Sequence, residues 1–254
     1  MSSFLKRVIP RIGKLVESGF YDVRFPPKKK RSLAGAVEGA ARGAIPLIAE
    51  IKPASPSAGR LFCGDARAAA GKMVAGGAVA LSVLTEPRFF GGSAVLLKED
   101  FGVPLLQKDF IASERQFLDG ADAVLLIQAL LDAVGADAEA LIEKAHARGL
   151  EVMLEAHTLD EFRRAKKTRA DLIGINNRSL ASLRVDLRTT GRILRAEAKD
   201  RLVVSESGIR NRADALRMLR AGADAVLVGT SLLRAKDIEG KVRGIVWGRV
   251  GGKG

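Results

Sequence analysis

The feature that most constrains the fold is a regular alternation, from about residue 47 onward, of short apolar runs with longer amphipathic segments. The runs are apolar almost throughout, as in parallel strands that are covered on both faces. We expect strands at residues 47–51, 80–84, 104–107, 123–127, 152–155, 172–175, 202–205 and 225–228. About eight strand–helix units within roughly 200 residues favour an α/β fold of the (β/α)8 TIM barrel type.

The segments between these strands have helical spacing, and several follow a residue suited to a helix N-cap: Ser113, Asp137 or Thr158. We expect helices at residues 65–75, 113–119, 137–148, 158–167, 187–198 and 211–220. A weak repeat, Gly-Ala-Asp-Ala-Val-Leu at 120–125 and again at 222–227, fits a doubled strand–helix unit. The alternative is an open doubly wound sheet, which would favour a Gly-x-Gly-x-x-Gly turn after the first strand, and none is present.

No linker-like change in composition interrupts residues 47–233, so we expect one (β/α)8-barrel domain over 1–254, with residues 1–44 as an N-terminal helical extension. Residues 1–20 carry charges among apolar residues at helical spacing and lack a signal-peptide core. No apolar run reaches the ~18 residues of a membrane span, so we expect no membrane association. The single Cys63 excludes an internal disulfide, and we expect a cytoplasmic protein.

The formal net charge of +13 raises the question of an anionic partner. The one dense basic run is Lys28-Lys29-Lys30-Arg31, which we interpret as a solvated loop before a helix. Aromatic residues make up only 5% of the chain and no nucleic-acid-binding module is recognisable. We therefore expect no nucleic acid partner, and an anionic small molecule is a possible reason for the charge.

Charged residues end the odd-numbered strands. Glu50 and Lys52 lie two apart at the end of the first strand and so share one face. Lys108 ends the third strand and Glu155 the fifth. Alternate strands build one inward layer of a barrel, and active sites of this fold lie at the carboxyl ends of its strands. Since buried Lys–Glu pairs are poor scaffolding, we interpret this group as catalytic.

Glycine-containing turns after the seventh and eighth strands form a second signal. Ser207-Gly208-Ile209 and Gly229-Thr230-Ser231 can present backbone N–H groups and hydroxyls to a phosphate, at the position where this fold frequently binds one. The two histidines and one cysteine do not have the spacing of a zinc site.

Neither a P-loop nor a Gly-x-Ser-x-Gly elbow is present. The chemistry must therefore depend on Lys and Glu, either as acid–base catalysis or as a Schiff base in an aldolase-type enzyme. A basic protein without catalysis on the same fold is the other alternative.

Six motifs, in order, resemble those of the indole-3-glycerol phosphate synthase family. They are Glu50-Ile51-Lys52-x-x-Ser55-Pro56-Ser57, Leu81-Ser82-Val83-Leu84-Thr85-Glu86, Lys108-Asp109-Phe110-Ile111, Gly174-Ile175-Asn176-Asn177-Arg178, Ser205-Glu206-Ser207-Gly208-Ile209 and Gly229-Thr230-Ser231-Leu232. The resemblance implies a lyase of tryptophan biosynthesis that closes the ring of 1-(2-carboxyphenylamino)-1-deoxyribulose 5-phosphate with loss of carbon dioxide and water. It implies no cofactor and no metal, a phosphorylated small-molecule substrate, and a monomer or weak homodimer.

The resemblance also implies roles for particular residues. Lys108 would be the general acid, Glu155 a partner in later proton transfers, and Glu50 and Lys52 would flank the reacting centre. Asn176 would orient the substrate. The implied substrate-binding residues are Ser55, Arg178, Glu206, Ser207, Gly208, Gly229 and Thr230, with Phe89, Phe110, Leu125, Leu180 and Leu183 around the aromatic ring.

Overall fold

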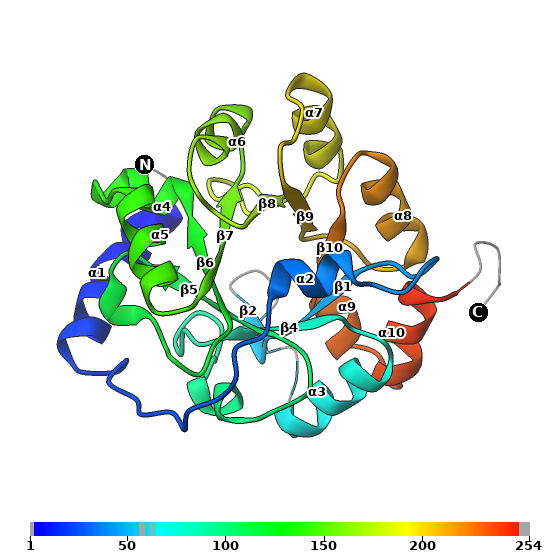
Figure 1. The fold of residues 1–254 in the computed structure, drawn as a ribbon, viewed down its shortest axis with the longest axis horizontal. Helices are drawn as coiled ribbons and strands as arrows, with labels where there is room; N and C mark the ends of the chain where they lie inside the picture. The colour runs from blue at the N-terminus through cyan, green and yellow to red at the C-terminus, as the bar shows by residue number, and fades with distance from the viewer. Residues whose placement is uncertain (1–2, 56–58, 61, 63, 249–254) are drawn as a thin grey trace.

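The computed structural model, which describes residues 3–55, 59–60, 62 and 64–248, contains a closed barrel of eight parallel strands (Figure 1). This confirms the predicted (β/α)8 TIM barrel. The strands, in chain order, are β1 (Leu47–Ile51), β4 (Ala80–Leu84), β5 (Leu105–Ile111), β6 (Ala123–Ile127), β7 (Glu151–Ala156), β8 (Leu172–Asn176), β9 (Leu202–Glu206) and β10 (Ala225–Val228). A small antiparallel pair, β2 (Ala54–Ser55) and β3 (Gly59–Arg60), follows β1. Pro56, Ser57 and Cys63 lie outside the described residues.

Five of the six expected helices form, with ends that differ by one or two residues. They are α3 (Ala66–Ala75), α5 (Ala138–Ala147), α6 (Leu159–Lys166), α7 (Arg188–Ala196) and α8 (Arg212–Arg220). The side chains of Asp137 and Thr158 accept backbone N–H groups at the starts of α5 and α6, as N-caps do.

The helix expected at residues 113–119 is wrong, because only the short 3-10 turn η2 (Glu114–Gln116) forms there. The buried side chain of Gln107 explains the early end. Its amide donates to the carbonyl of Gln116 at 2.8 Å and accepts from the N–H of Leu118 at 3.0 Å. A side chain thereby satisfies backbone groups that a longer helix would pair internally.

Helices α4 (Gln128–Val134), α9 (Thr230–Leu233) and α10 (Ile238–Val246) were not expected from the sequence. Helix α2 (Leu33–Glu38) is the helix expected after the basic run at residues 28–31, and the 3-10 turn η1 (Ala94–Lys98) forms between the second and third strands of the barrel. Helix α4 follows β6 directly, so the apolar pattern runs from strand into helix without a turn residue to separate them.

The expected N-terminal helix is present as α1 (Ser3–Glu17), which packs beside α4 and β5 (Figure 1). Its buried residues Phe4, Leu5 and Val8 join the apolar cluster that fills the barrel interior. Among the described residues, no helix is long and apolar enough to cross a membrane.

The basic run at residues 28–31 is not the solvated loop that the sequence suggested. Lys28 forms an ion pair with Asp122 at 3.1 Å, and its side chain is only 17% exposed. Lys30 donates to the carbonyls of Asp119 and Ala121, and Arg31 pairs with Asp100 at 3.0 Å. The run, which lies just before α2 in the chain, thus binds the segment that leads into the amino-terminal end of β6.

The weak repeat has a structural meaning at this end of the barrel. Asp122, Asp171 and Asp224 directly precede β6, β8 and β10, the fourth, sixth and eighth strands of the barrel. Each carboxylate accepts a backbone N–H from the start of the preceding strand: Leu105 at 2.8 Å, Val152 at 2.7 Å and Val203 at 2.8 Å, respectively. The repeated aspartate therefore joins neighbouring strands where they enter the barrel.

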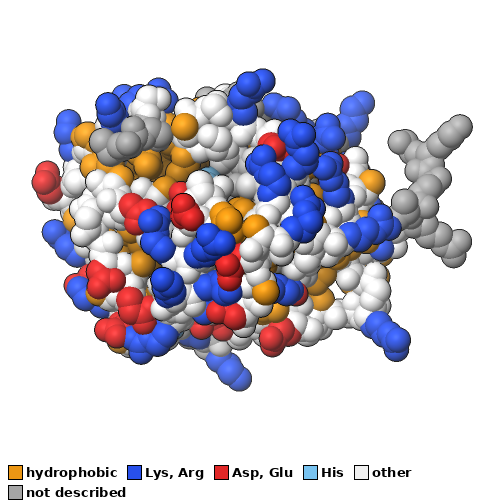
Figure 2. All heavy atoms as spheres, turned by 90° about the horizontal axis from the view of Figure 1, so that it is seen from above, with side chains coloured by type: hydrophobic (Ala, Val, Ile, Leu, Met, Phe, Trp, Pro, Cys, Tyr) orange, Lys and Arg blue, Asp and Glu red, His pale blue; other side chains and the backbone are white. Residues whose placement is uncertain are grey.

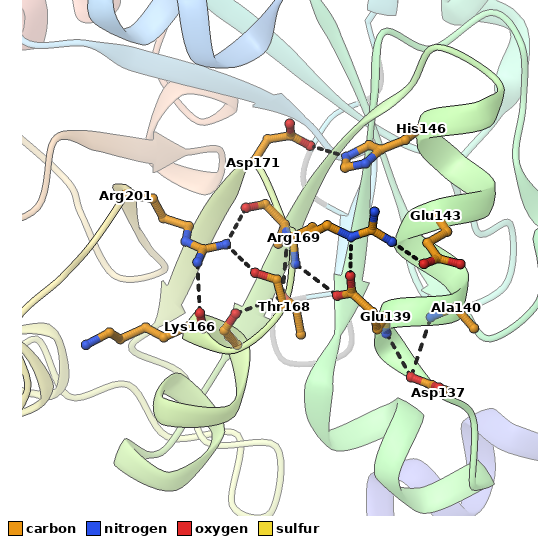
Figure 3. A network of polar contacts seen from close by, with 12 residues as sticks. Asp137, Glu139, Ala140, Glu143, His146, Lys166, Thr168, Arg169, Asp171 and Arg201 are labelled. Atoms are coloured by element: carbon orange, nitrogen blue, oxygen red, sulfur yellow. Dashed lines mark hydrogen bonds and ion pairs between the residues drawn. The ribbon is translucent and has the colours of Figure 1, made fainter.

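Lys and Arg side chains lie in separate groups over the face drawn in Figure 2. Many Lys and Arg residues have partners within the chain. Figure 3 shows two examples near the end of α6. Arg169 pairs with Glu139 and Glu143 of α5, and Arg201 donates to the carbonyls of Lys166, Thr168 and Ala170. Because a cation complements the carbonyls at a helix C-terminus, part of the positive excess serves the scaffold.

Candidate active site

The carboxyl ends of the strands surround a cavity of about 500 Å³. Its wall has three parts: a group of charged side chains on the strand ends, a set of apolar side chains, and the turns that follow β9 and β10. Such a concave, mostly apolar pocket with a few convergent polar groups is typical of a small-molecule site.

The charged part of the site is one layer of the barrel, with a side chain from each of four alternate strands. Lys108 of β5 lies 3.7 Å from Glu50 of β1, 3.6 Å from Glu155 of β7, and forms an ion pair with Glu206 of β9. Lys52 pairs with Glu50. The expectation that Glu50, Lys52, Lys108 and Glu155 converge on one mouth is therefore confirmed.

Glycines on the intervening strands make room for this layer. A side chain at Gly174 of β8 would collide with Oε1 of Glu206. A Cβ at Gly229, after β10, would lie 2.6 Å from Oε1 of Glu50. Two carboxylates thus occupy the space that a larger residue on the neighbouring strand would fill.

A bulge in β5 aims Lys108 into the cavity. The register between β5 and β6 shifts between Gln107 and Ile111, and bulges commonly redirect a side chain beside an active site.

Asp109 fixes the bulge, because its carboxylate accepts the N–H of Phe110 at 2.7 Å, the hydroxyl of Thr85 at 2.6 Å and that of Tyr21 at 3.2 Å. Burial raises the pKa of Asp109 to about 6, against these hydrogen bonds. Tyr21 connects the N-terminal segment to this strand.

Electrostatics keep Lys108 protonated. Burial lowers the pKa of a lysine, but the carboxylates of Glu206, Glu155 and Glu50 outweigh it and hold the pKa of Lys108 well above its ordinary value. Burial likewise opposes the ionisation of Glu50, yet Lys52 and Lys108 bring its pKa below the ordinary value. Lys108 is therefore protonated and can donate a proton, whereas a Schiff-base lysine needs a depressed pKa.

The other two carboxyls differ from each other. Against burial, Lys108, His157 and Asn176 lower the pKa of Glu155 to about 2, so Glu155 is ionised. Burial, with Glu155 and Glu50 nearby, raises the pKa of Glu206 to about 7 despite its ion pair with Lys108. Groups whose environments push their pKa values apart suit acid–base catalysis.

The turns after β9 and β10 form the opposite part of the cavity. Ser207 and Gly208 both have positive φ, 67° and 85°, and such consecutive residues can form a backbone concavity that binds anions. Gly229 and Thr230 line the cavity next to them, and Arg178 lies at the end of β8. Burial lowers the pKa of Arg178 while Glu50 opposes the change.

The apolar part comprises Phe110, Leu125, Leu180 and Leu183, as expected. Phe89 does not line the cavity; it packs edge-on against Phe4 and Phe110, with ring centroids 5.7 and 6.2 Å apart. Phe90 and Phe4 take places on the wall that the sequence did not suggest. The neighbouring Phe89-Phe90 pair gives no signal for which ring points inward, and Phe4 lies about a hundred residues before its partner Phe110.

The comparisons with known proteins agree with this geometry. The family model described as indole-3-glycerol phosphate synthase matches residues 15–245. The chain is 44% identical to the indole-3-glycerol phosphate synthase of Haloarcula marismortui over 222 residues, which cover 84% of this chain and 82% of that protein. It is 40% identical to that of Methanopyrus kandleri over 259 residues, with 97% of each chain covered. This chain belongs to the indole-3-glycerol phosphate synthase family.

Solved structures add support for the fold alone. A thiamine phosphate pyrophosphorylase from Pyrococcus furiosus superposes on this indole-3-glycerol phosphate synthase family member with a TM-score of 0.57 at 17% identity. The aligned part covers 80% of this chain and 95% of that one.

Two site residues of this family member lie differently from the sequence expectation. Glu206 was grouped with substrate-binding residues, but its side chain is 1% exposed and lies below the cavity wall as an ion-pair partner of Lys108. Ser55 lies in β2, and its side chain is outside the described part of the structure.

Cationic residues that sequence reasoning missed also line the cavity: Arg210, Arg234 and Lys241. A chain with 42 Lys and Arg residues gives no sequence signal that separates these three from surface cations. Among the described residues, no group of His, Cys, Asp and Glu side chains could hold a metal ion.

Proposed function

We propose that this chain is an indole-3-glycerol phosphate synthase that converts 1-(2-carboxyphenylamino)-1-deoxyribulose 5-phosphate into indole-3-glycerol phosphate, carbon dioxide and water. The observation that carries the mechanism is Lys108, held protonated by three carboxylates at the mouth of the cavity. The family match supports the enzyme class, a lyase of tryptophan biosynthesis.

Lys108 acts first in this mechanism. The aromatic carbon that bears the carboxylate attacks the ketone carbon, and Lys108 gives its proton to the ketone oxygen as the new bond forms. The bond to the carboxylate then breaks, its electrons return to the ring and carbon dioxide leaves. Only 15% of the Lys108 side chain is exposed, which supports a proton transfer shielded from bulk water. Electrostatic stabilisation is stronger in such a site than in water.

Dehydration completes the reaction. The new hydroxyl takes a proton from a lysine ammonium and leaves as water, while the adjacent carbon loses a proton to the ionised Glu155, and solvent returns the proton that the lysine gave up. Lys52 lies beside Glu50 and assists departure of the hydroxyl or binds the substrate carboxylate. Asn176 orients the substrate from the end of β8.

The substrate has an anionic and an aromatic end, and the cavity offers a match for each. Ser207, Gly208, Gly229 and Thr230 hold the phosphate, with Arg178 and the newly found cations around them. Phe110, Leu125, Leu180 and Leu183 surround the ring. The cationic phosphate end and the general positive charge suit a doubly anionic substrate.

An assay of the purified chain with the carboxyphenylamino substrate tests this function. We expect a rise in indole fluorescence with release of one carbon dioxide per product. The aldolase-type alternative requires a lysine adduct, so borohydride with substrate should trap none; a trapped adduct at Lys108 or Lys52, or no indole product, contradicts the proposal.

The setting of the enzyme is also proposed from the sequence. The chain forms a single barrel domain with the N-terminal extension packed on it, in keeping with the apolar patterning. It acts in the cytoplasm, in keeping with its lone cysteine. It is a monomer or weak homodimer and has no nucleic acid partner. Light scattering across protein concentrations measures the oligomeric state.

A further inference from the structure

His157 lies at the end of β7, two residues after Glu155, and its side chain is only 6% exposed. Its Nε2 is 3.1 Å from Oε1 of Glu155, and its Nδ1 is 3.4 Å from Oε2 of Glu161 in the first turn of α6. The backbone N–H of His157 donates to the same oxygen of Glu161 at 2.7 Å. The ring therefore lies between two carboxylates, that of Glu155 in the active site and that of Glu161 in helix α6.

We propose that His157 is a positioning residue for Glu155: as an imidazolium it links Glu155 to Glu161 and holds Glu155 ionised and directed at Lys108. This inference rests on the proposed function, since it assigns a role to Glu155 in the reaction. It adds to the site a residue that the sequence motifs did not indicate and that does not line the cavity.

The two neighbours of the ring decide its protonation. An ionised carboxylate can only accept hydrogen bonds, and a neutral imidazole has one donor and one acceptor nitrogen. With a carboxylate oxygen 3.1 Å from one nitrogen and another 3.4 Å from the other, a neutral ring would turn its lone pair toward an acceptor. Neither contact has hydrogen-bond geometry, so the ring interacts with the two carboxylates as ion pairs, and only the imidazolium can form both.

The charges of the site also favour a cation here. Glu155 shares Lys108 with Glu50 and Glu206, and Lys52 pairs with Glu50. A protonated His157 supplies a second cation to Glu155. Each oxygen of Glu155 then faces a cation, Oε1 facing His157 at 3.1 Å and Oε2 facing Lys108 at 3.6 Å, which fixes the direction of the carboxylate.

The charged groups that act on the ring are Glu155 from β7 and Glu161 from α6, with Lys108 of β5 behind Glu155. Burial lowers the pKa of His157, but the two carboxylates outweigh it and raise the pKa to about 9. Since the folded pKa is raised, this cation persists through neutral pH and is lost only as the pH rises through about 9.

The first test needs no change at His157. The chain has two histidines, and His146 of α5 lies elsewhere, beside Asp171 at 2.8 Å (Figure 3). In the His146→Gln variant, long-range ¹H–¹⁵N spectra report His157 alone. We expect both ring nitrogens to stay protonated to pH 8, with titration near 9; a pKa at or below the ordinary value of about 6.5 overturns the proposal.

The second test is the pH profile of kcat in His157→Gln, with His146→Gln as the matched control. Loss of the imidazolium raises the pKa of Glu155 from about 2, so we expect the acidic limb of kcat to move up by at least about one unit. The variant should then lose about tenfold more activity than the wild type at pH values below both limbs, with KM changed less than threefold. Glu161→Gln should shift the same limb in the same direction. If the acidic limbs of His157→Gln and of the wild type coincide, the inference is contradicted.

These outcomes separate the two proposals. If the wild-type chain makes no indole product, the proposed function fails while the histidine titration still tests the protonation of His157. If His157→Gln does not fold, the titration and the Glu161→Gln profile decide the question.

Discussion

Replacement of Lys108 by methionine tests the centre of the mechanism. Methionine keeps most of the apolar stem of lysine but removes the ammonium group, so three carboxylates face one another without their shared cation. Lys98 in η1 is exposed and does not line the cavity, so Lys98→Met is the matched control.

Turnover should fall at least ~10²-fold and up to ~10⁴-fold, the range for loss of a general acid, which corresponds to about 3–5.5 kcal/mol of activation free energy. The free energy of unfolding should also fall. Each carboxylate at 3.6–3.7 Å attracts Lys108 by about 4.5 kcal/mol at an effective dielectric constant of ~20, and desolvation offsets part of this sum. Loss of one partner of a buried pair typically costs ~3–5 kcal/mol.

The stability loss should depend on pH with a definite sign. In the wild type the pKa of Glu155 is depressed to about 2, so its ionisation stabilises the fold above the ordinary value of 4.5 and this contribution is lost as the pH falls toward 2. Without Lys108 the carboxyl pKa values rise. The difference in unfolding free energy between wild type and variant should therefore grow from pH 4 toward pH 8, as the carboxyls of the variant ionise without their cation, and it should shrink as the pH falls toward 2.

Indole fluorescence measures the turnover, and urea denaturation at pH 4, 6 and 8 measures the stability. The control variant should match the wild type in both. A folded Lys108→Met variant that retains more than about a tenth of the wild-type turnover would refute the role of Lys108, and a stability difference independent of pH would refute the charge argument.

Three further predictions concern other parts of the site and the scaffold. Gly174→Ala should displace Glu206 from Lys108 and lose about 1–3 kcal/mol of stability together with turnover, whereas Gly244→Ala, with open space around it, should not. Inorganic phosphate at millimolar concentration should raise KM without changing kcat, and the effect should be weaker in Arg178→Ala; noncompetitive inhibition would contradict the phosphate assignment. Glu151→Gln should lose about 1–3 kcal/mol in urea denaturation without a change in kcat, because Glu151 accepts the N–H groups of Leu33 and Ala34 at 2.7 and 2.9 Å.

Two local exceptions show where patterns of residues mislead. The basic run at residues 28–31 looks like a solvated loop in sequence, yet its binding partner Asp122 lies more than ninety residues later. The expected helix at residues 113–119 fails because Gln107, from the preceding strand, takes over its backbone hydrogen bonds. In both cases polar contacts with another element override a local preference.

The apolar pattern was sufficient to predict the barrel, because eight buried strands must each be apolar on both faces and the helices between them have their own period and caps. The sequence also determined which strand ends carry Glu50, Lys108 and Glu155, since the odd strands of a barrel share a layer. The role of each charged residue depends on contacts that form when the strands come together in the barrel. Burial and distance to Lys108 made Glu206 its partner below the cavity wall, and the close approach of α6 to β7 placed His157 between two carboxylates. Pairwise distances of a few ångströms between different strands set these pKa values, and no pattern along one strand contains them.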